Sequence, residues 1–372
     1  MSDPLTILMT SGAGPGVVGH LDAARNNGYA PVRMVVGDVC TDANVGFALS
    51  DVAVGLPAAD DPELIDALLG ICREHGVDVV WPVYDGELEP VVSARGRFEG
   101  ADVRLLTADE GTVRLCLDKE RFYSRLADTG LVLPCRVVRS AEELRSAAGE
   151  FGYPDRRVVV KPGRATGGRG FHVLDAAFDP HAGFLAERPD ATVCSLDAAT
   201  DAVGEGNGDG IVVMPFVGGQ EHGCDVLADG GEVAAAVTRR KLPPVREGMH
   251  TRIVVDEDED VLSVVRRLVA ELGADGLLSV DLREDDAGRL WVLEVNPRAG
   301  AYLGMACARV DLFGLALARA FGQRPGVEGF RRASEAVTGL RYWADLVQVE
   351  SGPRVLGVPC GRAGVVGQGA KV

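Results

Sequence analysis

Two neighbouring apolar segments near the carboxyl end, joined by a polar connector, constrain the fold of this chain more than any other feature. The first covers residues 277–281 (LLSVD), and the second covers residues 290–296 (LWVLEVN) and continues into Pro297 and Arg298. The connector, residues 284–288 (EDDAG), has the composition of a turn. The two segments are therefore predicted to be the strands of a hairpin.

Side-chain alternation in this hairpin brings polar groups together. Along residues 290–296 it predicts one face with Val292, Glu294 and Asn296, and an opposite face with Trp291, Leu293 and Val295. Asp281, at the end of the first strand, would then lie opposite Glu294. Carboxylate and amide oxygens suit Mg²⁺ that also bridges nucleotide phosphates. A polar strand face with a surface carboxylate is the alternative interpretation.

Length and composition limit the classes of protein to which this chain can belong. A chain of 372 residues has room for two or three domains. The formal net charge of −17 argues against nucleic acid or an anionic membrane as a partner. We find no apolar stretch long enough to span a membrane and no signal peptide at the start, so we expect a cytoplasmic protein. Eight scattered cysteines fit reduced thiols rather than a disulfide framework.

The first third of the chain alternates strand-like and helix-like segments. Short apolar runs occupy residues 5–10, 32–36, 77–81 and 103–106, and residues 62–75 and 87–97 look helical. Such alternation predicts a parallel sheet covered by helices. The pattern changes near residue 115.

The remaining segments predict a mixture of helices and antiparallel strands. We expect helices at residues 118–129, 141–150, 258–272 and 303–321, and strands at 158–162 and 171–174. Four further segments, 211–216, 224–227, 233–238 and 253–255, are predicted to form one antiparallel sheet, and residues 201–210 form a polar loop. The acidic run 256–260 is interpreted as a solvated helix start, where carboxylates favour the helix dipole.

A glycine-rich turn near the start satisfies a dinucleotide-binding fingerprint. Gly14, Gly16 and Gly19 follow a strand and open a helix, and Asp38 lies nineteen residues beyond Gly19. An NAD-dependent oxidoreductase is therefore one hypothesis. The alternative is that the glycines allow a ligand or a neighbouring loop to approach the helix N-terminus closely. A proline inside the fingerprint is also unusual for a dinucleotide site.

A second glycine-rich loop follows a lysine. Lys161 ends a strand, and residues 163–170, which include Gly167 and Gly168, would place backbone N–H groups around triphosphate oxygens. The segment is not a Walker A loop, because the lysine precedes the glycines. A solvated hairpin loop with an incidental lysine is the alternative, and Lys119 at a helix start is a further candidate cation.

Two strands contribute further candidates. Residues 212–217 resemble an extended hinge that leads to Glu221, although a core strand entering a turn would have the same pattern. Arg239, Arg240 and Lys241 form a basic triplet in an acidic protein. Alternation sends Arg239 and Lys241 to one face and Arg240 to the other.

Taken in order, these motifs resemble the ATP-grasp superfamily, and most closely single-copy relatives of the carbamoyl-phosphate synthase large subunit. The matching segments are LCLDKERF (115–122), VVVKPGRATGGRGF (158–171), VVMPFVGGQEHGCDVL (212–227), TRRK (238–241) and SVDLREDDAGRLWVLEVNPR (279–298). The resemblance implies an α/β fold in which an N-terminal Rossmann-like parallel-sheet domain, residues 1–114, precedes an ATP-grasp domain, residues 115–330. Two α+β subdomains, a small lid at about 135–215 and a large subdomain at about 216–330, would enclose the nucleotide. Residues 331–372 would form a C-terminal extension without an assigned role.

The resemblance also implies a role for each candidate residue. Lys119, Lys161 and the loop with Gly167 and Gly168 would contact ATP phosphates. Met214 and Phe216 would flank adenine, and Glu221 would hold the ribose. Either Arg239 or Lys241 would approach the γ-phosphate, and Arg298 would hold the acceptor carboxylate or acyl-phosphate. Asp281, Glu294 and Asn296 would bind two Mg²⁺ ions, with Mn²⁺ as a substitute.

By resemblance, the expected activity is an ATP-dependent carboxylate–amine ligase that forms an acyl-phosphate and releases ADP and phosphate. Its partners would be a small-molecule carboxylate and an amine, with a homodimer as one option. Asp281 departs from the synthases, which often have Gln or Glu at the first metal position. The chain also has one ATP-binding unit and no glutaminase segment. An enzyme that phosphorylates carbamate or bicarbonate, and a non-catalytic ATP-binding regulatory protein, are the alternatives.

Overall fold

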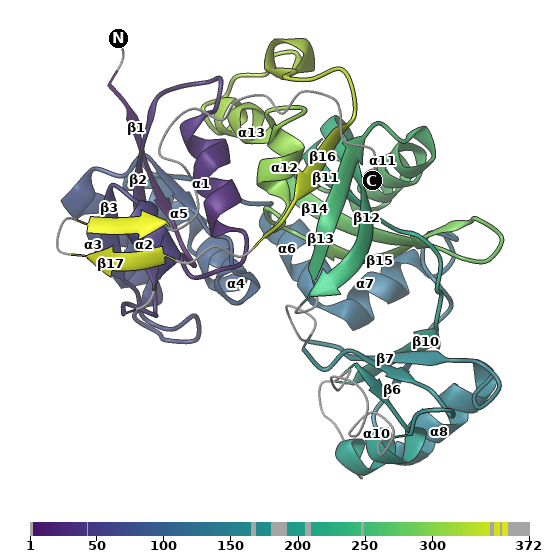
Figure 1. Ribbon diagram of the computed structural model, residues 1–372. Coiled ribbons are helices and arrows are strands. Elements are labelled where there is room, and N and C mark those ends of the chain that lie inside the picture. The colour runs from purple at the N-terminus through teal and green to yellow at the C-terminus, as the bar shows by residue number, and fades with distance from the viewer. Residues whose placement is uncertain are drawn as a thin grey trace.

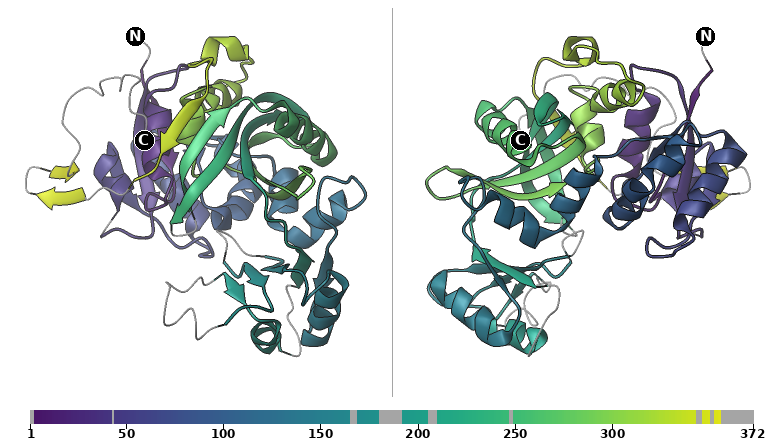
Figure 2. Two further views of the ribbon diagram at one scale, coloured as in Figure 1. Left: turned by 45° about the vertical axis from the view of Figure 1, so that its right-hand side comes forward. Right: turned by 180° about the vertical axis from the view of Figure 1, so that it is seen from behind.

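The computed structural model contains three sheets and one two-stranded ribbon (Figure 1). The structure describes residues 3–42, 44–164, 169–179, 192–204, 210–246, 249–342, 346–349 and 352–355. The first and third sheets lie side by side, and the second lies apart from them at the bottom of Figure 1 and of both views in Figure 2.

The first sheet is parallel and has the strand order β3-β2-β1-β4-β5. Its strands are β1 (Leu5–Met9), β2 (Val32–Asp38), β3 (Val52–Gly55), β4 (Val79–Trp81) and β5 (Arg104–Leu105). The helices that accompany it are α1 (Val17–Arg25), α2 (Val45–Leu49), α3 (Leu64–His75), α4 (Asp85–Ser93) and α5 (Arg95–Glu99). The predicted alternation of strands and helices is confirmed, but β3 was missed. The single helix predicted at 87–97 is wrong, because Ala94 leaves helical geometry between α4 and α5.

Two short helices, α6 (Glu110–Leu117) and α7 (Lys119–Leu126), follow the first sheet. The side chain of Asp118 caps α7 by accepting a hydrogen bond from the Arg121 amide. This cap begins the helix at Lys119, in agreement with the prediction that Lys119 stands at a helix start.

The second sheet, here called the lid, has the order β6-β10-β7-β8-β9. Its strands are β6 (Arg136–Val138), β7 (Val158–Pro162), β8 (His172–Leu174), β9 (Val193–Cys194) and β10 (Ile211–Pro215), and its helices are α8 (Ala141–Glu150) and α10 (Leu196–Val203). Strand β10 pairs with β6 and β7, so the prediction that residues 211–216 share a sheet with 224–227 is wrong. Sequence alone could not separate them, because both segments are apolar.

The third sheet, here called the large sheet, is antiparallel and has the order β15-β14-β11-β12-β13-β16. Its strands are β11 (Glu221–Asp229), β12 (Glu232–Arg246), β13 (Met249–Asp256), β14 (Gly276–Glu284), β15 (Leu290–Asn296) and β16 (Val337–Leu340). Strand β16 pairs with β13, so the large sheet includes residues beyond 330. The domain boundaries drawn from the sequence stay a prediction.

Three further helices pack on the large sheet. Helix α11 (Glu259–Leu272) is capped by the Asp258 side chain, and its first turn carries Glu259 and Asp260, as the helix-start interpretation of the acidic run predicted. The single helix predicted at 303–321 is wrong. It is divided into α12 (Leu303–Cys307) and α13 (Leu312–Ala320), and Asp311 caps the second.

The remaining described residues form η1 (Val327–Phe330) and a ribbon of β17 (Leu346–Val349) with β18 (Gly352–Val355). The ribbon lies beside α2 (Figure 1). None of the helices in the described part of the chain has the length and apolarity needed to cross a membrane.

Buried side chains show how the large sheet is covered on its two faces. One face, with Cys224, Val226, Val280 and others, packs against α6, α7 and α11. On the other face, residues such as Leu227, Val237 and Ile253 share one core with α1, α12, α13 and the first sheet. We call this second face the site face. The first sheet and the large sheet are thus joined through buried apolar contacts.

Candidate functional site

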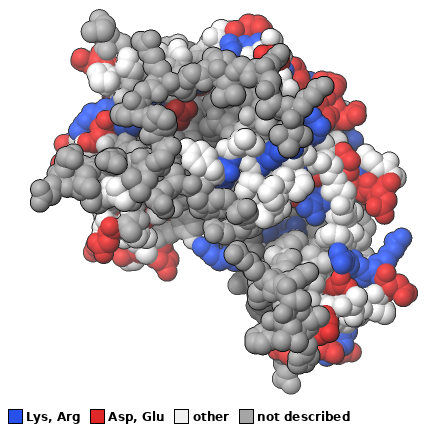
Figure 3. Space-filling model, in the orientation of Figure 1, with Lys and Arg blue, Asp and Glu red and all other residues white. Residues whose placement is uncertain are grey.

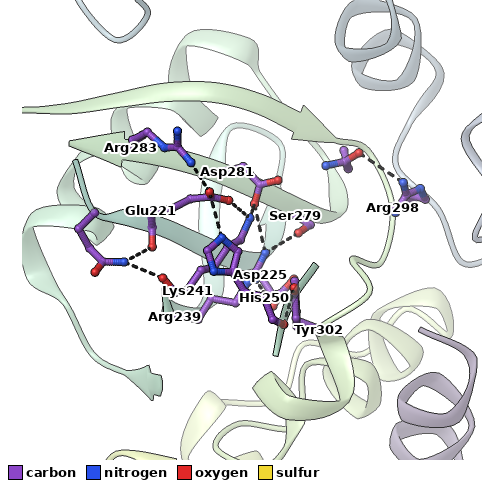
Figure 4. Close-up of polar contacts among 12 residues, drawn as sticks. Glu221, Asp225, Arg239, Lys241, His250, Ser279, Asp281, Arg283, Arg298 and Tyr302 are labelled. Atoms are coloured by element: carbon purple, nitrogen blue, oxygen red, sulfur yellow. Dashed lines mark hydrogen bonds and ion pairs between the residues drawn. The ribbon is translucent and has the colours of Figure 1, made fainter. Parts of the chain in front are cut away.

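Most of the candidate residues collect on the site face of the large sheet (Figure 4). Strand alternation sends every second side chain there. The strand register brings together Glu221, Gly223 and Asp225 of β11, Arg239 and Lys241 of β12, Ser279, Asp281 and Arg283 of β14, and Glu294 and Asn296 of β15. Arg240, on the opposite face, pairs with Asp256 at the surface, so the predicted split of the basic triplet is confirmed.

Arg239 is 2% exposed and is held by groups of the sheet itself. Its guanidinium donates hydrogen bonds to the Asp225 carboxylate and, over 2.9 Å, to Ser279 Oγ. It also stacks over the Tyr302 ring at 5.4 Å. Gly223 makes the room, since a Cβ there would lie 2.6 Å from Arg239 Nε. Both side chains of the Arg239–Asp225 pair are fully buried, which makes the pair a fixed part of the site floor.

Lys241 lies beside two carboxylates. Its Nζ is 2.6 Å from Glu221 Oε1 and 2.8 Å from Asp281 Oδ1. Burial by itself would lower the pKa of Lys241, but the charges of Asp281 and Glu221 outweigh it and raise the pKa above its ordinary value. Lys241 therefore stays protonated and forms an ion pair with a predicted metal ligand, Asp281.

Glu221 is surrounded by cationic and imidazole groups. Besides Lys241, it contacts Arg283, and its Oε2 lies 3.3 Å from His250 Nε2. Burial alone would raise the pKa of Glu221, but the His250 hydrogen bond and the charges of Lys241 and Arg283 lower it well below its ordinary value. The carboxylate is thus ionised and has partners on both oxygens. Its expected contact with ribose stays a prediction.

Asp281 and Glu294 are direct cross-strand neighbours on β14 and β15. A β-bulge next to this pair interrupts the alternation, so that Val292 pairs with buried Leu282 in the core behind the sheet. The prediction that Val292 shares the face of Glu294 is therefore wrong. The bulge keeps Glu294 opposite Asp281 while the rest of β15 fills the core.

Glu294 combines burial with opposing charges. Burial raises the pKa of the Glu294 carboxyl, Lys119 and Lys161 oppose the rise, and the charges of Asp281 and Asp85 add to it. Among the described residues, no group of three or more His, Cys, Asp or Glu side chains is placed to hold a metal ion. The predicted set holds two carboxylates and the amide of Asn296, a donor chemistry that fits a hard cation such as Mg²⁺.

Lys161 extends from the lid strand β7 to the edge of the large sheet. Its Nζ donates to Tyr123 Oη over 2.6 Å and to the Leu293 carbonyl over 3.1 Å. Burial lowers the pKa of Lys161 to about 8, although the charge of Glu294 opposes the shift and that of Lys119 adds to it. Two cations and one buried acid therefore meet where the lid joins the large sheet.

The predicted hinge lies at the end of lid strand β10. Met214 is buried, and Phe216 is half-buried with its amide bonded to the Arg157 carbonyl over 3.2 Å. Gly167 and Gly168 lie outside the described residues. The contacts of Met214 and Phe216 with adenine stay a prediction, as do the ligand contacts of the other candidates.

Arg298 follows β15 and points toward the first sheet (Figure 4). Its Nε and Nη2 lie 2.6 Å and 2.9 Å from the two carboxylate oxygens of Asp85. Nη2 also lies 3.3 Å from Asn296 Oδ1. The first sheet thereby contributes an acid, Asp85, that sequence reasoning did not select.

One other cationic residue near the site, Arg341, was also missed. Arg341 follows β16, donates to the Ala301 carbonyl over 2.7 Å and stacks over the Tyr302 ring at 4.7 Å. Arg341 is thus the third cation beside the Tyr302 ring, after Arg239 and Lys241. The signal available in the sequence was a basic residue in an otherwise unassigned segment, too weak to select it.

The N-terminal glycines pack against the same region. A Cβ on Gly16 would lie 2.9 Å from the Ala301 Cα, and Gly19 approaches the Gly304 backbone. The Asp38 carboxylate accepts hydrogen bonds from the amide of Ala13, in the glycine-rich turn after β1, and from the amide of Cys40, two residues beyond Asp38. Close packing of α1 on α12 thus explains the glycines without a dinucleotide.

On the face shown in Figure 3, Lys and Arg side chains gather between the lid and the large sheet, whereas Asp and Glu side chains lie mostly around the outer edges. An acidic protein therefore concentrates positive charge near the site. Such local charge favours anionic ligands.

Comparison with known proteins agrees with the fold. Residues 208–342 match a family model described as ATP-grasp in the biosynthetic pathway with Ter operon. The carbamoyl phosphate synthase large chain of Pseudomonas putida is 28% identical over an alignment of 273 residues that covers 67% of this chain and 23% of that protein. The chain thus spans about a quarter of the length of this curated relative.

Two solved structures share the architecture. The biotin carboxylase domain of Hydrogenobacter thermophilus 2-oxoglutarate carboxylase, in complex with MgADP, ADP and bicarbonate, has a TM-score of 0.62 and 17% identity, and the match covers 89% of this chain and 73% of that chain. An L-amino acid ligase from Bacillus licheniformis has a TM-score of 0.61 and 17% identity, with 91% and 80% covered. These likenesses confirm the fold class predicted from the sequence.

Proposed function

We propose that this chain, which carries an ATP-grasp domain and the ATP-grasp fold, is an ATP-dependent ligase that joins a carboxylate to an amine. The observation that carries the proposal is the convergence of charges on Glu294. Lys161 comes from the lid, Lys119 from α7, Asp281 from β14 and Asp85 from α4. The lid, the large sheet and the helices α4 and α7 thus contribute charged side chains to one place.

The described residues suit a nucleotide held between the lid and the large sheet. Lys161 and Lys119 would face the phosphates, and Met214 and Phe216 would lie at the adenine. Asp281, Glu294 and Asn296 would hold two Mg²⁺ ions, with Mn²⁺ as a substitute. Bound there, the metal would neutralise phosphate oxygens. Solved neighbours support nucleotide binding, since one of them contains MgADP.

The main obstacle to the first step of the proposed reaction is repulsion between two negatively charged groups. A carboxylate and the γ-phosphate of ATP are both anions, so their reaction needs cations on both sides. Lys241, bonded to Asp281, and Lys161 would offset charge at the phosphate. Arg298 would orient the carboxylate through its positive charge and through the N–H of Nη1 that the contacts with Asp85, Asn296 and the Ala299 carbonyl leave over. The products of this step would be an acyl-phosphate and ADP.

In a second step, the nitrogen of an amine would attack the acyl carbon, and the acyl–phosphate bond would break with release of phosphate. Water competes with the amine, so the acyl-phosphate must be shielded from solvent. The lid, which lies at the bottom of both views in Figure 2, contacts the large sheet through Lys161 and the Leu293 carbonyl. Closure of the lid would supply the shielding.

A small-carboxylate reaction is the second candidate. The sequence relative is a carbamoyl phosphate synthase large chain, and one structural neighbour contains bicarbonate. In that case the enzyme would phosphorylate carbamate or bicarbonate. The two candidates share the first step and differ in the size of the carboxylate that is accepted.

The test is ADP and phosphate release from Mg²⁺–ATP across a panel of amino acids, small carboxylates and bicarbonate, with and without amines, followed by mass spectrometry of the products. ADP with a condensed amide would support the ligase, and ADP with carbamoyl phosphate the second candidate. AMP and pyrophosphate would contradict an acyl-phosphate mechanism. ATP binding without turnover on any substrate would favour a regulatory protein.

A further inference from the structure

A cluster of acids lies at the carboxyl edge of the first sheet, outside the nucleotide site. Its acids are Asp38, which ends β2, and Asp85 and Glu87 in the first turn of α4, after β4; the hydroxyl residue Thr10 follows β1. Strand β1 lies between β2 and β4. Open α/β sheets bind ligands beyond the carboxyl ends of such strands, where the connections diverge to opposite faces. This edge is therefore a natural place for a substrate contributed by the N-terminal unit.

Glu87 is the member of the cluster without a counter-charge. The residue is 6% exposed, and its Oε2 atom is buried and has no hydrogen-bond partner. The carboxyl forms a hydrogen bond with the Thr10 side chain. Within the described part of the chain, no Lys, Arg or His forms an ion pair with it. A buried carboxylate without a cation is costly, so this position is completed by a ligand or stays neutral.

The other acids of the cluster are already satisfied. Asp38 accepts hydrogen bonds from two backbone amides, and Asp85 is paired with Arg298. Burial raises the pKa of Glu87 to about 7, with the Thr10 hydrogen bond opposing and the charge of Asp38 adding to the rise. A cation bound at Glu87 would therefore meet negative charge from more than one side.

The cluster borders the proposed reaction site. Asp85, two residues before Glu87, contacts Arg298, and its charge acts on Glu294. The turn before α1 packs against Ala301, three residues after Arg298. A small molecule whose carboxylate lies at Arg298 would have its remaining groups near the edge of the first sheet.

We propose that the Glu87 carboxylate binds an ammonium group of the small-molecule substrate, which makes that substrate an amino acid or another ammonium-bearing compound. The assignment of this ligand as a substrate rests on the proposed ligase function. Binding of an ammonium group at Glu87 does not depend on the ligase function, and it is tested separately.

The first test uses methylammonium, the smallest organic ammonium, as the probe. Thermal unfolding of the full chain is measured at pH 8 in 0.2 M methylammonium chloride and in 0.2 M sodium chloride, for the wild type, Glu87→Gln and Glu89→Gln. Glu89 lies on the same helix and is partly exposed, with an ion pair to Arg164, so its variant is the matched control. The expected result is a rise of about 2 °C or more with methylammonium for the wild type and Glu89→Gln only. Equal midpoints in both salts, or the same rise in Glu87→Gln, would overturn the proposal.

The second test asks which ammonium is held. L-lysine, L-norleucine, 6-aminohexanoate and hexanoate share a six-carbon chain and differ only in their ammonium groups. In calorimetric titrations with Mg²⁺ and a non-hydrolysable ATP analogue, we expect an ammonium-bearing member to bind about tenfold or more tightly than hexanoate. The preference should shrink to less than about twofold in Glu87→Gln and persist in Glu89→Gln. A preference that survives in Glu87→Gln, or no ammonium-dependent binding at all, counts against the proposal.

Failure of the proposed ligase function and failure of the proposed ammonium site would give different results. If the wild type responds to methylammonium but releases no ADP with any substrate, the ligase function fails and the ammonium site stands. If ADP is released with neutral carboxylates as readily as with amino acids, and Glu87→Gln leaves every KM unchanged, the ligase stands and the ammonium site fails. Where an ammonium-bearing substrate is found, its KM should rise in Glu87→Gln while the KM for ATP does not.

Discussion

Asp85 and Arg298 form a two-bond ion pair that joins the start of α4 to the end of β15 across 213 positions of sequence. Asp85 is 5% exposed, and the Arg298 side chain is 17% exposed. The pair therefore connects the first sheet to the large sheet beside the reaction site. It also sets the orientation of the guanidinium expected to bind a carboxylate.

Asp85→Asn should destabilise the protein, because it leaves a mostly buried guanidinium without its counter-charge. The expected loss in the free energy of unfolding is about 3 kcal/mol, measured by chemical denaturation. Asp66→Asn removes a comparable contact with Arg97 at the surface, where both side chains are more than half exposed, and should cost less than about 1 kcal/mol. Equal losses in the two variants would show that the Asp85–Arg298 pair is not a structural connection.

Glu294→Gln should abolish ADP release while leaving the fold intact. The change keeps the size of the side chain but removes the negative charge between Lys161 and Asp281 that a cation would need. Asp286→Asn, in the exposed turn of the same hairpin, is the control and should retain full activity. ADP release at the wild-type rate in Glu294→Gln would remove Glu294 from the catalytic site.

Lys161→Met should weaken ATP binding without destabilising the protein. Loss of a charged contact to phosphate is expected to raise the dissociation constant about tenfold or more in calorimetry. The folded pKa of Lys161, about 8, lies below its ordinary value of 10.5 because of burial. Stability should therefore increase as the pH rises from about 8 to 10.5, and the cost of the buried charge is full below pH 8. The variant should be at least as stable as the wild type at pH 7, and Arg136→Met on the exposed lid strand β6 should change neither property.

Substitution of Arg239 should mainly affect stability, whereas substitution of Lys241 should mainly affect the rate of ADP release. Arg239→Met leaves Asp225, which is 1% exposed, without its partner, and should lower the free energy of unfolding by about 3–5 kcal/mol. The double variant Arg239→Met with Asp225→Asn should recover part of that loss. Lys241→Met should slow ADP release, because its ammonium adjoins Asp281, with a smaller effect on stability. The reverse pattern would assign the phosphate contact to Arg239.

Glu87→Gln should change how stability depends on pH. The folded pKa of Glu87, about 7, lies above its ordinary value of 4.5 because burial disfavours the charged form. The wild type therefore loses stability as the pH rises from about 4.5 to 7, and the full loss, on the order of 3 kcal/mol, is present above pH 7. At pH 8 without an added ammonium compound, Glu87→Gln should be more stable than the wild type, and the difference should be small near pH 4. Denaturation curves at pH 4, 6 and 8 measure this, and a constant difference would contradict it.

Local sequence patterns were sufficient to predict features that depend on a single strand or a single turn. Alternation correctly divided Arg239 and Lys241 from Arg240, and the polar turn at residues 284–288 correctly placed Asp281 opposite Glu294. Caps were also predictable, because Asp258 and Asp118 act on amides within three residues. The same patterns failed at the bulge in β15, since one extra residue leaves the composition of a strand unchanged.

The order of the motifs was sufficient to identify the fold class by resemblance to a known family. Side-chain periodicity, a property of neighbouring residues, predicted only the alternation of strands and helices in the first third. Tertiary structure alone decided which strand joins which sheet, as β10 shows by pairing within the lid. It also decided that Lys161 reaches Leu293, that Arg298 meets Asp85 and that Glu87 is buried without a cation. Such contacts depend on how separate sheets pack, and burial and charge at these points arise only when distant segments come together.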